Sequence, residues 1–158
     1  MPLLKIETNQ PVDADAQSRL IGKASQQVAA LLGKPERYVM VSLQENPAML
    51  FGGSNAPLAY LELKSIGLPE ARTAELSQAL ADLMSSDLGL PADRVYIEFA
   101  DAPRSMWGRH GGTFSLGLGP FLTTQEHEGP QTNSVLVRAV PSMRIGTPNP
   151  RSTNPPRA

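Results

Sequence analysis

The feature of this sequence that most constrains its fold is a segment that occurs twice. The two copies are Leu32-Gly33-Lys34-Pro35-Glu36-Arg37-Tyr38-Val39 and Leu88-Gly89-Leu90-Pro91-Ala92-Asp93-Arg94-Val95. In each copy a glycine follows a helical pattern, and a turn containing proline then leads into a run of strand-forming residues. We interpret the repeat as an internal duplication of a βαβ unit. The alternative is a chance similarity between two ordinary helix-to-strand loops.

The spacing of apolar residues predicts the same elements in both halves. Asp13 or Asp15 is expected to cap the first helix, and Gly33 to end it. Pro69 suits the first turn of the second helix, which is expected to stop near Gly89. In chain order, the predicted elements are a strand at 3–9, a helix at 16–32, strands at 38–43 and 58–63, the second helix, and a strand at 95–100.

These elements predict an α/β (α+β) fold: a tandem βαβ repeat that forms a four-stranded mixed sheet with two helices on one face. The opposite face of the sheet also carries apolar residues, so we expect it to need a cover of its own. A subunit with a bare sheet face and unpaired strand edges is expected to form oligomers.

The composition of the chain changes near residue 115. We assign residues 1–114 to one domain and residues 115–158 to a C-terminal tail that is rich in proline and lacks lysine. Such a tail buries too little apolar surface to offset the entropy lost on ordering, so we expect most of it to be disordered. Within it, only residues 134–140 have a strand-forming pattern.

The composition also excludes several classes of site and partner. The chain has no cysteine, which excludes disulfides, thiol redox chemistry and cysteine–metal sites. His110 and His127 lie far apart in sequence, so we do not expect a catalytic zinc site. A net charge of −1 without a long basic run argues against nucleic acid or a membrane as partner. Because the chain lacks a signal peptide pattern, we expect a cytoplasmic protein, or one secreted by a non-classical route.

Proline at position 2 is a candidate general base. Initiator methionine is normally removed before a small residue, which leaves the Pro2 nitrogen as a secondary amine at the start of the first strand. An α-amino group titrates near neutrality, and an apolar pocket beside a cation lowers its pKa further. Such a base suits the removal of a proton next to a carbonyl group. Met-Pro is also a common start in proteins without this chemistry.

Lys34, in the first copy of the repeat, is a candidate for the cation beside this base. Its ammonium group can bind a substrate carboxylate and help to lower the pKa of Pro2. The alternative is an ordinary turn lysine that faces solvent.

Five short motifs, in one order over one domain, give residues 1–114 a resemblance to the macrophage migration inhibitory factor (MIF) family of the tautomerase superfamily. Gly108 and Thr113-Phe114 extend the resemblance. The five motifs are Pro2, Leu32-Gly33-Lys34-Pro35, Phe51-Gly52-Gly53-Ser54, Lys64-Ser65-Ile66-Gly67 and Asp93-Arg94-Val95-Tyr96-Ile97.

The resemblance implies a MIF-like fold and a homotrimer with three active sites at the subunit boundaries. It implies tautomerisation of phenylpyruvate-like and dopachrome-like substrates, with Pro2 as the base and Lys34 as the ligand of the substrate carboxylate. The remaining implied contacts are the backbone of Ile66, Tyr96 from the adjacent subunit, and Tyr38, Trp107 and Phe114 in the apolar walls.

Three features depart from the family pattern. One is the absence of the paired cysteines that some animal members carry, whose places Leu58 and Leu61 hold, so that a thiol–oxidoreductase role is excluded. Glu98 stands where well-studied animal members carry an asparagine near the pocket. A carboxylate there would repel an acidic substrate and raise the pKa of Pro2, whereas elsewhere it would face solvent or pair with an arginine. Arg109 stands where animal members often have tryptophan, and Trp107 can rebuild the aromatic wall from two residues earlier.

We therefore expect a cofactor-free isomerase that acts on a small aromatic keto acid or quinone-like substrate. A secreted, cytokine-like protein that binds a receptor is the alternative, because the family includes signalling members. A third hypothesis is a superfamily relative that uses Pro2 for dehalogenation or hydration, with Arg109 and Glu98 as accessory groups.

Overall fold

The computed structural model describes residues 1–115, and the predicted tail beyond them lies outside the described residues. Short 3₁₀ turns precede β2, α2, β4 and β5. Neither helix of the described part is long and apolar enough to cross a membrane. The elements are β1 (Leu3–Thr8), α1 (Ala14–Leu32), β2 (Met40–Glu45), β3 (Ala59–Ser65), α2 (Thr73–Leu88), β4 (Val95–Asp101), β5 (Gly108–Arg109) and β6 (Gly112–Thr113).

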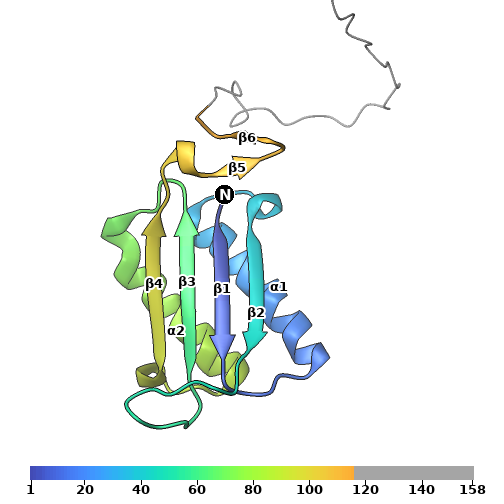
Figure 1. Ribbon diagram of the computed structural model, residues 1–158, viewed down its shortest axis with the longest axis vertical. Coiled ribbons are helices and arrows are strands. Elements are labelled where there is room, and N and C mark those ends of the chain that lie inside the picture. Colours follow the sequence, from blue (N-terminus) through green and yellow to red (C-terminus); the bar gives the residue numbers. More distant parts are fainter. Residues whose placement is uncertain (116–158) are drawn as a thin grey trace, which may run out of the picture. The chain divides into compact units, whose positions relative to one another are not determined.

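One mixed sheet with the strand order β2-β1-β3-β4 forms the centre of this part of the chain. The outer strands run parallel to their neighbours, and the two central strands, β1 and β3, are antiparallel. Both helices cover the same face of the sheet (Figure 1). The predicted α+β fold is therefore confirmed, and a small β5–β6 hairpin that was not predicted follows β4.

The repeated segment folds in the same way in both halves. Gly33 and Gly89 end the two helices in the left-handed conformation, with φ of 61° and 65°. A 3₁₀ turn that starts after Pro35 or Pro91 then leads into a strand. The amide of Tyr38 donates a hydrogen bond to the Pro35 carbonyl at 3.0 Å. Because this bond closes the turn, Tyr38 lies outside β2. The strand therefore begins at Met40, two residues later than predicted.

The first helix begins as expected at an aspartate, since the Asp13 side chain accepts a hydrogen bond from the amide of Ala16 at 2.9 Å. The second begins later than expected. Pro69 precedes a 3₁₀ turn at Glu70–Arg72, and α2 starts only at Thr73.

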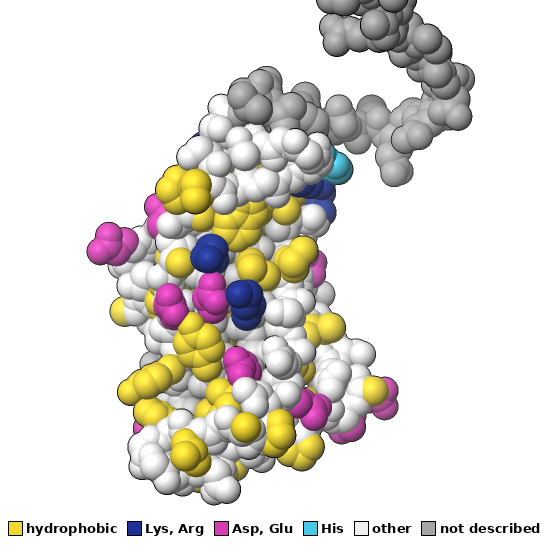
Figure 2. Space-filling model, viewed as in Figure 1, with side chains coloured by type: hydrophobic (Ala, Val, Ile, Leu, Met, Phe, Trp, Pro, Cys, Tyr) yellow, Lys and Arg dark blue, Asp and Glu magenta, His cyan; other side chains and the backbone are white. Residues whose placement is uncertain are grey.

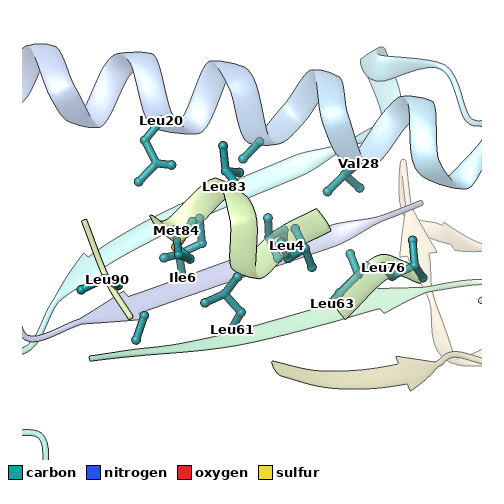
Figure 3. Close-up of a cluster of buried hydrophobic side chains, with 13 residues drawn as sticks. Leu4, Ile6, Leu20, Val28, Leu61, Leu63, Leu76, Leu83, Met84 and Leu90 are labelled. Atoms are coloured by element: carbon teal, nitrogen blue, oxygen red, sulfur yellow. The ribbon is translucent and has the colours of Figure 1, made fainter. Parts of the chain in front are cut away.

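The hydrophobic core lies between the helices and the two central strands (Figure 3). Alternate residues of β1 and β3 point into it, while a stripe of α1 residues at four-residue spacing packs from above. The largest side chains of the core, all but excluded from solvent, are Leu4, Ile6, Leu20, Leu61, Leu63, Leu76, Leu80, Met84 and Leu90.

The other face of the sheet is more polar than the sequence led us to expect. At its centre Glu62 forms ion pairs with Lys5 at 3.3 Å and with Lys64 at 3.4 Å. Figure 2, which looks onto this face, shows the charged groups in the middle with hydrophobic groups around them. Two hydrophobic residues of the outer strands, Met40 on β2 and Tyr96 on β4, are 64% and 63% exposed. The apolar residues needing cover therefore lie around a charged centre.

Two glycine-to-alanine substitutions are expected to change stability in opposite directions. Gly22 lies inside α1 with no atom within 4 Å of an added Cβ, so Gly22→Ala should raise the free energy of unfolding by about 0.5–1 kcal/mol. Gly89 has a φ of +65°, so Gly89→Ala should lower it by about 1–2 kcal/mol. Urea denaturation followed by circular dichroism, at one protein concentration, measures both. Effects of the same sign would contradict this reading of the helix end.

Candidate functional site

The candidate site lies where the chain begins. Pro2 directly precedes β1, and its carbonyl accepts a hydrogen bond from the amide of Met40 at 3.0 Å. Its ring is fully buried. The start of the chain is thus held against β2 before the first strand begins, and Figure 1 shows it beside the β5–β6 hairpin.

Lys34 connects the first repeat to the loop that follows β3. Its own amide bonds back to the carbonyl of Ala29 at 2.9 Å, which fixes the residue at the end of α1. Its ammonium group donates hydrogen bonds to the hydroxyl of Ser65, at 2.9 Å, and to the carbonyl of Ile66. The predicted residues Lys34 and Ile66 are therefore in direct contact.

Asp101, the last residue of β4, holds the other side of this loop. Its carboxylate accepts hydrogen bonds from the amides of Gly67, at 2.8 Å, and Leu68, at 3.1 Å. Gly67 adopts a φ of 66°, which a glycine allows without strain. The carbonyl of Ser65 also accepts the amide of Ala102 at 3.0 Å. The two repeats are thus joined at this end of the sheet.

The β5–β6 hairpin brings the predicted aromatic residues together. The amide of Phe114 donates to the carbonyl of Trp107 at 3.1 Å, and both side chains are half-buried. The hairpin turns at His110 and Gly111, whose φ angles are 52° and 75°. The guanidinium carbon of Arg109 lies 5.0 Å from the ring centroid of Tyr38. Arg109 is therefore close to the predicted wall residue Tyr38 on the other repeat.

Burial and positive charge both act on the amine at the start of the chain. Desolvation, followed by the charges of Lys34, Arg104 and Arg109, lowers the pKa of the Met1 α-amino group to about 6. The pKa of Lys34 is also lowered by desolvation, against a smaller opposing effect of Asp101. An amine in this environment is mostly neutral at pH 7 and can accept a proton.

Tyr96 and Glu98 lie away from this cluster within the chain. Tyr96 is near the other end of β4, where its ring centroid is 4.4 Å from that of Phe51. Glu98 is exposed on the open sheet face and accepts a hydrogen bond from the Tyr60 hydroxyl at 2.5 Å, which raises the pKa of Tyr60 to about 12. Of the alternatives considered for Glu98, the side chain within this chain is exposed to solvent, and it pairs with a tyrosine and not with an arginine.

Sequence reasoning missed four residues of the cluster. Ser65 and Asp101 fix the loop beside Lys34, Arg104 adds positive charge near the chain start, and Arg37 lies over the ring of Tyr38. Ser65 lies in one of the family-like motifs and could have been found there. The other three carried no spacing signal. Within residues 1–115, no group of His, Asp and Glu side chains is arranged to hold a metal ion.

Comparisons with known proteins cover the same part of the chain. A family model described as macrophage migration inhibitory factor (MIF) matches residues 1–115. A macrophage migration inhibitory factor homolog of Brugia malayi is 40% identical over 72% of this chain and 99% of that protein. The macrophage migration inhibitory factor of Mus musculus is 34% identical over 73% and 100%. A crystal structure of a homologue from Prochlorococcus marinus is 47% identical with a TM-score of 0.67, covering 71% of this chain and 98% of that one.

The contact between Asp101 and its neighbours leads to a prediction for Lys34. Asp101→Asn keeps an acceptor for the loop amides but removes the charge that raises the pKa of Lys34. The pKa of Lys34 should therefore fall further. An NMR titration of ¹³C-methylated lysines measures it, with Glu62→Gln, whose carboxylate pairs with Lys5 and Lys64, as the control. An unchanged or raised Lys34 pKa in the Asp101 variant would contradict the arrangement.

Proposed function

The chain belongs to the macrophage migration inhibitory factor family, and we propose that it is a cofactor-free keto–enol tautomerase whose general base is the nitrogen of Pro2. The observation that carries the proposal is the α-amino group at the chain start, whose pKa is lowered to about 6 by burial and three cations. Removal of Met1 would move this amine one residue closer to β1, to a ring that is already fully buried. The same desolvation and the same cations would then act on the Pro2 nitrogen.

In the proposed reaction, a phenylpyruvate-like keto acid loses a proton from the carbon next to its ketone to the Pro2 nitrogen. The electron pair left on that carbon forms the enol double bond, and the ketone oxygen takes up negative charge and then a proton. The reverse sequence returns the keto form. Proton transfer to a positioned base of matched pKa contributes about 10²–10⁴-fold to such a rate.

Lys34 is proposed to bind the carboxylate of the substrate. An ammonium group has three donors, of which Ser65 and Ile66 take two, so that one remains for a substrate oxygen. Its positive charge would also stabilise the developing enolate. Ile66 offers its backbone, and Tyr38, Trp107 and Phe114 are proposed as the walls around the substrate. A dopachrome-like quinone is a further candidate substrate.

A homotrimer is proposed as the active assembly, because the chain by itself does not bring Tyr96 to Pro2. Tyr96 lies towards the opposite end of the sheet and is 63% exposed. A second copy that presented this side chain to the site would complete the wall and cover part of the open sheet face. Glu98, two residues further along β4, would approach the site from the same copy.

A blocked amine provides the test that changes the protein least. Protein that retains Met1 has the Pro2 nitrogen in an amide, with every side chain of the site still present. We expect the processed protein to ketonise enol-phenylpyruvate, and the unprocessed form to lose at least about 100-fold in kcat/KM, because an amide nitrogen is no base. Intact mass separates the two forms, and ultraviolet absorbance follows the enol.

Pro2→Gly, which keeps a free amine but loses the rigid ring, should fall between the two forms. Equal activity of the processed and Met1-retaining proteins would contradict the assignment of Pro2. Absence of turnover in both would contradict the tautomerase proposal itself and favour a binding role.

A further inference from the structure

We call four cationic side chains the cationic cluster. Lys34, Arg104 and Arg109 act on the amine at the chain start, and Arg37 shares the ring of Tyr38 with Arg109. None takes part in the ion pairs found among residues 1–115, which join Lys5 and Lys64 to Glu62, Lys23 to Asp87, and Arg72 to Glu75. Several lysines and arginines elsewhere thus have a carboxylate partner, whereas no carboxylate of the described residues forms an ion pair with the cluster.

The geometry of the cluster rests on Tyr38. The guanidinium carbons of Arg37 and Arg109 each lie 5.0 Å from the centroid of the Tyr38 ring. Their separation is therefore at most about 10 Å, twice that distance. Arg37 comes from the turn that follows α1, and Arg109 from the β5–β6 hairpin. Two guanidinium groups from different parts of the chain thus converge on one aromatic ring.

Asp101, the carboxylate that acts on Lys34, does not balance this charge. Its Oδ1 atom accepts the amides of both Gly67 and Leu68 in the loop after β3. Even when Glu36, which precedes Arg37 in the same turn, is counted with Asp101, two carboxylates against four cations leave an excess of positive charge. A substrate with a single carboxylate would offset only one more of these charges, through Lys34.

The contacts of Tyr38 also disfavour a purely aromatic substrate. A flat ring binds best when it can stack on an aromatic face. Here two guanidinium groups already lie over the Tyr38 ring. A guanidinium, in contrast, presents a planar fork of donors that matches the two oxygens of a carboxylate.

We propose that the site selects keto acids that carry a second carboxylate, with Lys34 binding the carboxylate next to the ketone and the Arg37–Arg109 pair binding the other. This inference rests on the proposed tautomerase function and names its substrate class. The reaction is unchanged: a carbon-bound proton moves to Pro2, the ketone becomes an enol, and no electron donor or acceptor is required.

A matched pair of substrates tests the selection. Phenylpyruvate and 4-carboxyphenylpyruvate undergo the same reaction and differ only in the second carboxylate. We expect the dicarboxylate to have a kcat/KM at least about tenfold higher, as a charge-assisted hydrogen bond allows, and the ratio to fall towards one in Arg109→Gln. Because Arg109 also lowers the pKa of the amine, its loss alters both rates, and the ratio of the two cancels that effect.

Arg19→Gln is the matched control, since Arg19 is an exposed arginine near the start of α1, far along the helix from Lys34. The control substitution also removes one positive charge, but at a place outside the cationic cluster. It should leave the ratio of the two kcat/KM values unchanged. A wild-type ratio near one, or a ratio that Arg109→Gln does not lower, would overturn the proposal.

A binding measurement decides the inference even if neither substrate is turned over. Trp107 is the single tryptophan of the chain and lies in the hairpin segment beside Arg109, so its fluorescence reports on this site. Glutarate should bind at least about tenfold more tightly than butyrate, and Arg109→Gln should remove the difference. Equal binding of the two acids would contradict the proposal. Inorganic phosphate binding as tightly as glutarate would also contradict it, by showing a general anion site.

Discussion

The structure around the chain start depends on one constraint, which is a partly buried amine facing positive charges that no nearby carboxylate balances. Both burial and like charge disfavour the protonated amine, so they act in the same direction on its pKa. Lys34 experiences the same conditions, and only Asp101 acts against them. The neutral amine and the excess of positive charge are therefore two results of a single arrangement. The first suits a base, and the second suits an anionic substrate.

The duplicated fold explains how this arrangement arises from an ordinary scaffold. In both repeats a glycine ends the helix and a 3₁₀ turn precedes the strand. The residue after the glycine differs, however. In the second repeat it is Leu90, which is 1% exposed and packs in the core. In the first repeat it is Lys34, whose ammonium group donates hydrogen bonds to Ser65 and Ile66 after β3. One position thus serves packing in one half and charge placement in the other.

Much of the fold could be predicted because its signals are local. The two glycines, the two prolines and the apolar spacing identify the repeat without reference to the rest of the chain. The start of β2 was misplaced because a hydrogen bond from Tyr38 to Pro35 closes a turn that strand propensity does not reveal. The hairpin was missed because its strands are only two residues long. The ion pairs of Glu62 depend on strand register, which the sequence does not specify.

The candidate site was predictable where a motif carried it, as for Pro2, Lys34 and Ile66. The meeting of Arg37 and Arg109 on Tyr38 could not be predicted, because it joins a turn and a hairpin far apart in sequence.

The most direct test of the account is an NMR titration of the Pro2 nitrogen in processed protein labelled with ¹⁵N-proline. The predicted midpoint lies below pH 7, close to the pKa of about 6 to which burial and the three cations lower the Met1 α-amino group. A midpoint at or above about 8, the ordinary value of an α-amino group, would contradict it.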